Sequence, residues 1–239
     1  MKKRLLMCLF TIVVTFSWAH GNAHAVERVV AASVPSDLWY ENVFLLAEPY
    51  GMGYQNFIVQ VGYKSKQTIY RFPKWKDDKY GPNLFREDIN GDKLKDIIVT
   101  LDHSKNQIHV LNEYIDPIRN FREVHVEEPD HAVKRLVKME RKGNIVKLQT
   151  TVQQEVMLDL KELYHYKLDP NNLTVSTSDK VQFFVVKNKL TAYIGVWVPS
   201  LESPIGRPIG DFILTYEWDG KQYIVKDVMF ERYIPPLYD

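Results

Sequence analysis

Alternation of apolar and polar residues, interrupted by short turn signals, is the feature that most constrains the fold of this chain. Apolar side chains occupy every second position in residues 190–198, and the same period of two runs through residues 212–218. A β-strand places successive side chains on opposite faces, so this pattern predicts strands with one buried face. Asp219-Gly220 follows the second run, and this dipeptide favours a hairpin because both turn positions need positive φ. The sequence therefore predicts an all-β fold of antiparallel hairpins.

The same signals predict strands along most of the chain. Two more hairpins are expected to turn at Lys187-Asn188-Lys189 and at Lys142-Gly143-Asn144. Further strands are expected at Val43–Ala47, Asn56–Val61, Thr68–Phe72, Asp96–Leu101, Ile108–Leu111, Arg122–Val126, Leu136–Glu140, Ile145–Gln149 and from Tyr223 onward. Hairpins that recur every 30 to 40 residues suit a propeller-like domain, a barrel or a sandwich, and the pattern does not choose among the three.

Two segments depart from simple alternation. His131–Met139 could form a short helix with Asp130 as its N-cap, although a strand from Leu136 onward fits the hairpin pattern better. Pro199–Gly210 contains three prolines and two glycines and is expected to be a long loop, which is either functional or a rigid surface connector.

The first 25 residues have the three parts of a secretory signal. Lys2, Lys3 and Arg4 are basic, residues 5–18 are almost continuously apolar, and Ala23-His24-Ala25 places small residues where a signal peptidase cuts. An apolar run of fourteen residues is short for a membrane span, which needs about 20. We therefore expect an exported protein, secreted or held in the cell envelope, that starts at residue 26 and is not anchored in the membrane.

Charge and cysteine content narrow the class of the exported chain. Removal of the signal takes the formal net charge from +1 to −2, which gives no electrostatic argument for nucleic-acid binding. The single cysteine, Cys8, lies in the signal, so the exported chain contains no disulfide. Its stability is expected to come from core packing or from a bound metal.

One motif carries recognisable chemistry. The segment Asp88–Asp96 reads D-x-N-G-D-x-x-x-D. Calcium takes six to eight oxygen ligands, and a tight loop with oxygen-bearing side chains at alternate positions can wrap the ion. The expected ligands of one calcium ion are the side chains of Asp88, Asn90, Asp92 and Asp96 together with the Leu94 carbonyl.

The loop differs from an EF-hand and resembles another family. Lys93 occupies the place of the EF-hand glycine, Val99 that of the bidentate glutamate, and an apolar strand follows the loop. The pattern resembles the calcium loop of FG-GAP/VCBS repeats. In this chain Lys93 stands where those repeats have their second glycine. Residues 40–115 also resemble secreted proteins of Gram-positive bacteria with one such repeat. The resemblance implies a structural calcium and no particular activity. The alternative is an ordinary Asn-Gly turn with solvated acidic residues, which Lys93 and Lys95 favour.

Catalytic motifs are not recognisable in the sequence. It has no G-x-S-x-G, no glycine-rich phosphate loop, and no closely spaced pair among the histidines after the signal, His103, His109, His125, His131 and His165. The tract Pro73–Pro82, with Trp75 and Tyr80, is expected to be a loop-like ligand surface beside the calcium loop. Trp197 is expected to be exposed and Trp218 to be buried.

We therefore expect one β-rich domain over residues 26–239, with a calcium-loop half up to about residue 115 and a second β half after it. The expected function is non-catalytic binding of an extracytoplasmic ligand at or outside the cell envelope. A secreted hydrolase of wall polysaccharide or peptide, with structural calcium, is one alternative, and a structural or assembly protein of the envelope is another. The sequence does not indicate the ligand or the oligomeric state.

Overall fold

The fold is all-β, as the alternation predicts. The computed structural model describes residues 27–62, 67–79, 81–101, 107–153, 155–163, 168–169 and 171–233. Strands account for 65% of the structure and helices for 7%. The expected signal, residues 1–25, lies outside the described residues, as do Tyr80, His103 and His165. Among the described residues, no helix is both long and apolar enough to cross a membrane.

Three sheets are four-stranded antiparallel meanders in chain order. The N-terminal sheet contains β1 (Val29–Val34), β2 (Val43–Tyr50), β3 (Gly53–Val61) and β4 (Thr68–Asp77). The central sheet contains β5 (Asn83–Glu87), β6 (Asp96–Leu101), β7 (Gln107–Ile115) and β8 (Arg119–Val124). The C-terminal sheet contains β12 (Ser176–Val186), β13 (Lys189–Ser200), β14 (Ser203–Trp218) and β15 (Tyr223–Arg232).

The remaining elements are short. A fourth, three-stranded sheet contains β9 (Lys138–Lys142), β10 (Ile145–Gln149) and β11 (Val156–Asp159). The helices are the 3-10 turn η1 (Trp39–Glu41), α2 (Pro129–Leu136) and α3 (Leu160–Leu163).

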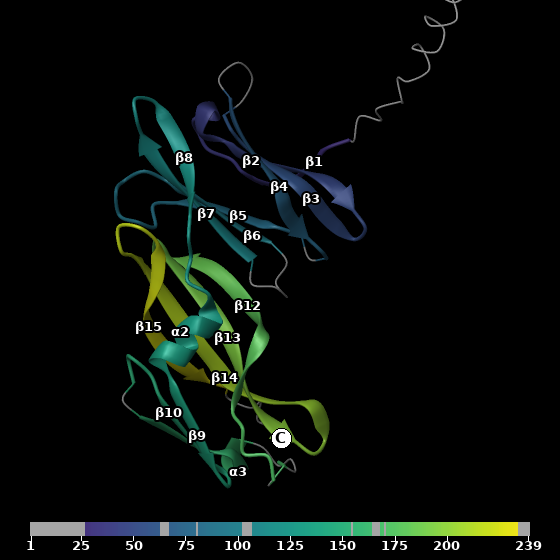
Figure 1. The fold of residues 1–239 in the computed structure, drawn as a ribbon, viewed down its shortest axis with the longest axis vertical. Coiled ribbons are helices and arrows are strands. Elements are labelled where there is room, and N and C mark those ends of the chain that lie inside the picture. The colour runs from purple at the N-terminus through teal and green to yellow at the C-terminus, as the bar shows by residue number, and fades with distance from the viewer. Residues whose placement is uncertain are drawn as a thin grey trace, which may run out of the picture.

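The central sheet lies between the N-terminal and C-terminal sheets and is covered on both faces (Figure 1). All six residues of β6 are buried. Ile97 belongs to the core shared with the N-terminal sheet, and its neighbour Ile98 belongs to the core shared with the C-terminal sheet. Successive side chains of β6 therefore pack alternately into two cores. The packing of sheets face to face is sandwich-like, and no sheet closes into a barrel among the described residues.

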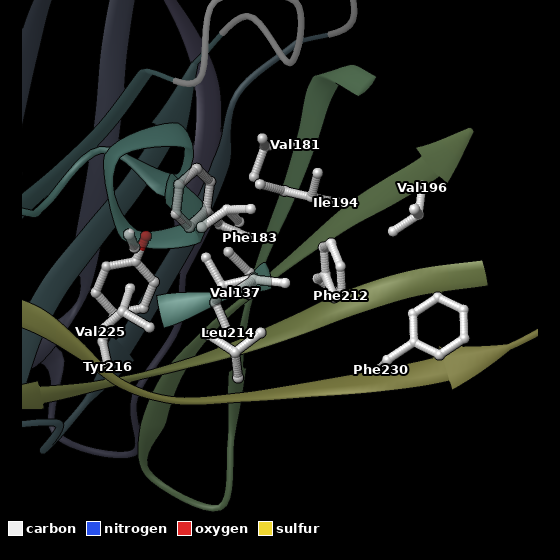
Figure 2. Packing of buried hydrophobic residues seen from close by; sticks show 14 of the residues in the cluster. Val137, Val181, Phe183, Ile194, Val196, Phe212, Leu214, Tyr216, Val225 and Phe230 are labelled. Carbon is white, nitrogen blue, oxygen red and sulfur yellow. The ribbon is translucent and has the colours of Figure 1, made fainter. Parts of the chain in front are cut away.

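The larger core lies on the inner face of the C-terminal sheet (Figure 2). Ile194 and Val196 of β13, Phe212 and Leu214 of β14, and Phe230 of β15 are each at most 4% exposed. Besides the central sheet, α2 and the three-stranded sheet contribute buried residues to this core. The long strands of the C-terminal sheet therefore carry one continuous apolar face.

The expected hairpins are confirmed. Lys187 and Asn188 both have positive φ, 50° and 59°, between β12 and β13. Gly143, at φ 59°, turns between β9 and β10, and Gly220, at φ 96°, lies between β14 and β15. Turn residues that tolerate left-handed backbone thus set the strand register at all three places.

Two expectations were wrong. Pro199–Gly210 is not a long loop, because it forms the end of β13 and the start of β14. Register shifts after Val196 and Val198 relax the ladder there, which accommodates prolines that donate no hydrogen bond. The helix begins at Pro129 with Glu128 as N-cap, not Asp130, and ends at Leu136, so the following strand starts at Lys138.

Candidate metal centre

The segment Asp88–Asp96 connects β5 to β6, at one end of the strands of the central sheet. Asp88 accepts hydrogen bonds from two loop amides, through Oδ1 from Gly91 N at 2.8 Å and through Oδ2 from Lys93 N at 2.9 Å. Gly91 has φ 82° and Lys93 has φ 72°. These two left-handed residues turn the chain around the Asp88 carboxylate.

Asn90 and Asp92 continue this arrangement. Asn90 Oδ1 accepts the amide of Asp92 at 2.9 Å, and Asp92 Oδ1 accepts the amide of Leu94 at 2.8 Å. Asn90 Nδ2 also donates to Asp92 Oδ2 at 3.1 Å. The side chain of Asp92 is exposed and Leu94 is half-buried. Side-chain oxygens at alternate positions thus bind the backbone of their own loop.

Lys93 takes the backbone conformation that a glycine favours. A left-handed conformation costs a residue with a Cβ about 1 kcal/mol or more. The loop keeps that conformation although lysine stands where the FG-GAP/VCBS pattern has its second glycine. Lys93 therefore holds a left-handed backbone conformation in spite of its Cβ, which places strain at this residue.

Asp96 is the buried member of the set. Asp96 is 0% exposed. Its Oδ2 accepts a hydrogen bond from the amide of Ile89 at 3.3 Å, and its Oδ1 accepts one from the amide of Glu113 at 3.0 Å. Tyr223 Oη, from the C-terminal sheet, lies 3.4 Å from Oδ2 and 3.1 Å from Asn112 Oδ1. Burial raises the pKa of Asp96 to about 7, and the nearby charge of Asp92 acts in the same direction.

The side chains of the loop have the ligand chemistry that calcium prefers, but they do not surround a common centre in this structure. Asp88, Asn90, Asp92 and Asp96 offer hard oxygen ligands, and a carboxylate oxygen that accepts one amide hydrogen bond retains a further lone pair. Their carboxylates face backbone amides, and among the described residues no three acidic, histidine or cysteine side chains converge closely enough to hold a metal. A bound calcium ion would supply positive charge beside carboxylates that otherwise repel one another.

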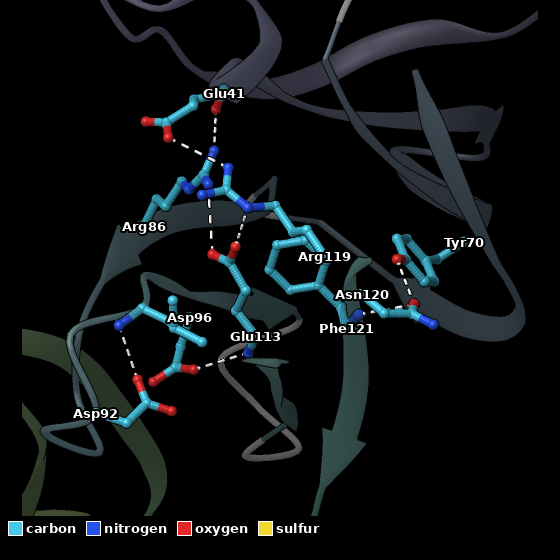
Figure 3. A network of polar contacts seen from close by, with 10 residues as sticks. Glu41, Tyr70, Arg86, Asp92, Asp96, Glu113, Arg119, Asn120 and Phe121 are labelled. Atoms are coloured by element: carbon cyan, nitrogen blue, oxygen red, sulfur yellow. Dashed lines mark hydrogen bonds and ion pairs between the residues drawn. The ribbon is translucent and has the colours of Figure 1, made fainter. Parts of the chain in front are cut away.

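The loop is connected to a buried ionic network on the other face of the central sheet (Figure 3). Glu113, whose amide binds Asp96, forms ion pairs with Arg86, at 3.6 Å, and with Arg119. Arg119 also reaches Glu41 Oε1 at 3.2 Å, and Arg86 donates to the Glu41 carbonyl. Burial raises the pKa of Glu113 and lowers that of Arg86.

The expected ligand surface around Trp75 is wrong. Trp75 lies in β4, not in a loop, and is only 6% exposed. Its ring stacks between Phe72 and His109, with both centroids 3.9 Å away. His109 Nδ1 in turn pairs with Glu123 at 2.8 Å. Polar neighbours suggested exposure, but a register shift in β4 between Phe72 and Lys76 brings Trp75 onto the core face beside Phe72.

The partners of Asp96 have no signal in the local sequence around the loop. Asn112 and Tyr223 lie in strands distant in the chain, and only the packing of β7 and β15 brings them to the loop. Glu113 follows Asn112 and therefore faces the opposite side of the central sheet.

No family model, curated protein or solved structure matches this chain.

Proposed function

We propose that this chain is an exported, calcium-stabilised β-module that acts by binding a ligand at or outside the cell envelope and not by catalysis. The observation that carries the proposal is the loop Asp88–Asp96, in which oxygen side chains at alternate positions line a turn with two left-handed residues. We assign one calcium ion to Asp88, Asn90, Asp92, Asp96 and the Leu94 carbonyl. The resemblance to FG-GAP/VCBS repeats supports this assignment.

The position of the loop explains how calcium would stabilise the module. Asp96 binds an amide of β7 and lies beside Tyr223 of the C-terminal sheet. The side chain of Glu113, the β7 residue whose amide binds Asp96, forms an ion pair with Arg119. Arg119 also pairs with Glu41, which lies between β1 and β2. An ion that fixes the loop would therefore act where all three large sheets are connected.

Thermal unfolding of the purified protein, with a chelator and then with millimolar calcium, tests the metal site. A ligand at 100 times its dissociation constant stabilises the folded state by about 2.7 kcal/mol, which raises the unfolding midpoint by several degrees. Asp92→Ala is expected to remove this response. Asp219→Ala is the matched control, because Asp219 Oδ1 also accepts two backbone amides in an exposed turn, from Lys221 and Gln222, both at 2.8 Å.

The two variants separate a metal site from a turn. Both lose side-chain hydrogen bonds to the backbone, so both are expected to lower the midpoint in the chelator. Only Asp92→Ala should lose the calcium response. If the wild-type protein unfolds at the same midpoint with and without calcium, Asp88–Asp96 is an Asn-Gly turn that binds no calcium. Export is tested separately, by the mass of the protein recovered outside the cytoplasm, which should correspond to a chain that begins at Val26.

A further inference from the structure

The outer face of the C-terminal sheet carries an open groove beside the β13–β14 hairpin. This hairpin lies at the lower end of the sheet in Figure 1. It consists of two adjoining hollows of about 510 and 320 Å³, and Ser176, Trp197 and Ile205 line both. These volumes fall within the range of small-molecule sites, about 300–1,000 Å³. The groove is large enough for an elongated ligand that passes Trp197.

Trp197 forms the aromatic centre of the groove. Its neighbours Val196 and Val198 are at most 1% exposed on the inner face, so Trp197 points to the outer face. A Cβ on Gly195 would lie 2.8 Å from Trp197 Nε1. The glycine therefore gives the indole the space to lie over the strand, where a half-buried ring lines both hollows.

The indole N–H has no acceptor among the described residues, although Nε1 is buried. A buried indole N–H usually has a hydrogen-bond partner, and an orphaned one needs an explanation. The cause here is packing, because Nε1 lies against Gly195 and is shielded from solvent. The remaining surface of the half-buried indole is the part that a ligand in the groove can contact.

A buried arginine holds the wall of the smaller hollow. Arg141 of β9 is 6% exposed and donates to the carbonyls of Asn172, at 3.0 Å, and Asp169, at 3.3 Å. Gly206 shapes the hairpin on the other side, since its φ is 81° and a Cβ there would lie 2.6 Å from the Val198 carbonyl oxygen. Both sides of the hollow are thus fixed by specific contacts.

The lining matches a neutral sugar. Apart from Trp197, the groove is lined by the apolar residues Val198, Pro199, Pro204 and Ile205, and by the hydroxyl and amide side chains of Asn172, Ser176, Thr177, Ser178, Ser200 and Ser203. The charges of Asp179 and Lys180 have opposite sign, and that of Asp169 lies near Arg141. An apolar ring surrounded by polar groups without net charge complements a pyranose, which has a flat C–H face and a rim of hydroxyls.

An extended peptide fits this edge less well. β12 is an edge strand, and peptides often add a strand to such an edge. However, the pairing of β12 with β13 shifts between Thr177 and Val181, which places a bulge beside the groove. Bulges twist an edge strand away from further pairing. The backbone ladder that a peptide needs is therefore interrupted beside Trp197.

We propose that this groove binds a linear, neutral polysaccharide with equatorial linkages, and that Trp197 stacks on one of its sugar rings. The inference rests on the proposed function, in which the module acts by binding, and it names the class of ligand. Equatorial linkages keep successive rings extended, which suits a groove of two adjoining hollows. The calcium loop, in the central sheet, contributes no residue to it.

Titration of the full protein with the β-1,4-linked hexamers of glucose and of N-acetylglucosamine tests the inference, by tryptophan fluorescence and by calorimetry. We expect at least one hexamer to bind, and Trp197→Ala to weaken its affinity about tenfold or more, which is about 1.4 kcal/mol. Trp197→Phe keeps a ring and should lose less. Trp39→Ala is the matched control, because Trp39 is 47% exposed in η1, away from the groove.

The outcomes separate this inference from the calcium proposal. No binding of either hexamer at millimolar concentration, or equal binding by Trp197→Ala and wild type, overturns the saccharide site even if calcium raises the unfolding midpoint. Saccharide binding that depends on Trp197 supports it even if calcium has no effect. Binding of an extended heptapeptide through Trp197, without binding of the hexamers, would assign the groove to strand addition and overturn the inference. Circular dichroism of Trp197→Ala and Trp197→Phe verifies that both fold.

Discussion

The two faces of the central sheet solve the same packing problem with different chemistry. The face toward the N-terminal sheet combines apolar side chains with stacked rings and the ion pairs of Glu113 with Arg86 and Arg119. The face toward the C-terminal sheet is apolar in its middle, with Asp96, Asn112 and Tyr223 at one end and the Asn83–Thr100 hydrogen bond at the other. Burial of charge here therefore follows from strand alternation, which sends adjacent residues of β7 to opposite cores.

The charged face is expected to be the more sensitive one to loss of a single group. Glu113 is 2% exposed, and its removal leaves two guanidinium groups without their buried partner. Removing one member of a buried pair typically costs 3–5 kcal/mol. Glu113→Ala should therefore lower the free energy of unfolding by about 4 kcal/mol in urea denaturation. Glu123→Ala, on the same sheet with a side chain 44% exposed, is the control and should cost less than about 1 kcal/mol. A loss that small for Glu113→Ala would show that water reaches the network.

Adjacent isoleucines compare the two faces directly. Ile97 and Ile98 are both 0% exposed, and they belong to different cores. Each change to alanine should cost about 3 kcal/mol, within the usual range of 2–5 kcal/mol for such cavities. If the sheets unfold as one cooperative unit, both variants shift a single transition with an unchanged slope against urea. Two transitions, with Ile97→Ala moving one and Ile98→Ala the other, would show that each face stabilises a separate folding unit.

The polar end of the C-terminal face should contribute less. Tyr223 is fully buried, and its hydroxyl lies beside Asp96 and Asn112. Tyr223→Phe removes this hydroxyl without a large change of volume and should cost about 1 kcal/mol. A double-mutant cycle with Asn112→Ala measures whether the two groups act together, and a coupling energy of about 0.5 kcal/mol or more is expected. Additive effects would mean that the hydroxyl serves only Asp96.

The sequence predicted the elements better than their environment. Period-two patterns located the strands, and Asn188, Gly143 and Gly220 marked turns that the structure confirms. The pattern failed at Pro199–Gly210, where bulges absorb prolines that would break a regular ladder. It also failed at Trp75, whose burial depends on a sheet from another part of the chain. For the candidate site, local sequence identified the loop, but its links to Glu113 and Tyr223 required knowledge of how three sheets stack.

A still smaller change in stability is expected in the loop Asp88–Asp96, which connects β5 to β6 at one end of the central sheet. Lys93 has φ 72° without being a glycine, so Lys93→Gly should relieve backbone strain and raise the free energy of unfolding by about 0.5–1 kcal/mol. Gly91→Ala is the matched control, because Gly91 has φ 82° and no atom lies within 4 Å of a Cβ placed there. Gly91→Ala should lower the free energy of unfolding by about 1 kcal/mol through backbone strain alone.

Both variants are measured by urea denaturation with and without calcium. If Lys93→Gly also increases the calcium response, the lysine weakens metal binding by straining the loop. An equal gain in both conditions would mean that position 93 affects only the turn, and a loss of stability would show that the lysine side chain makes a contact that outweighs its strain.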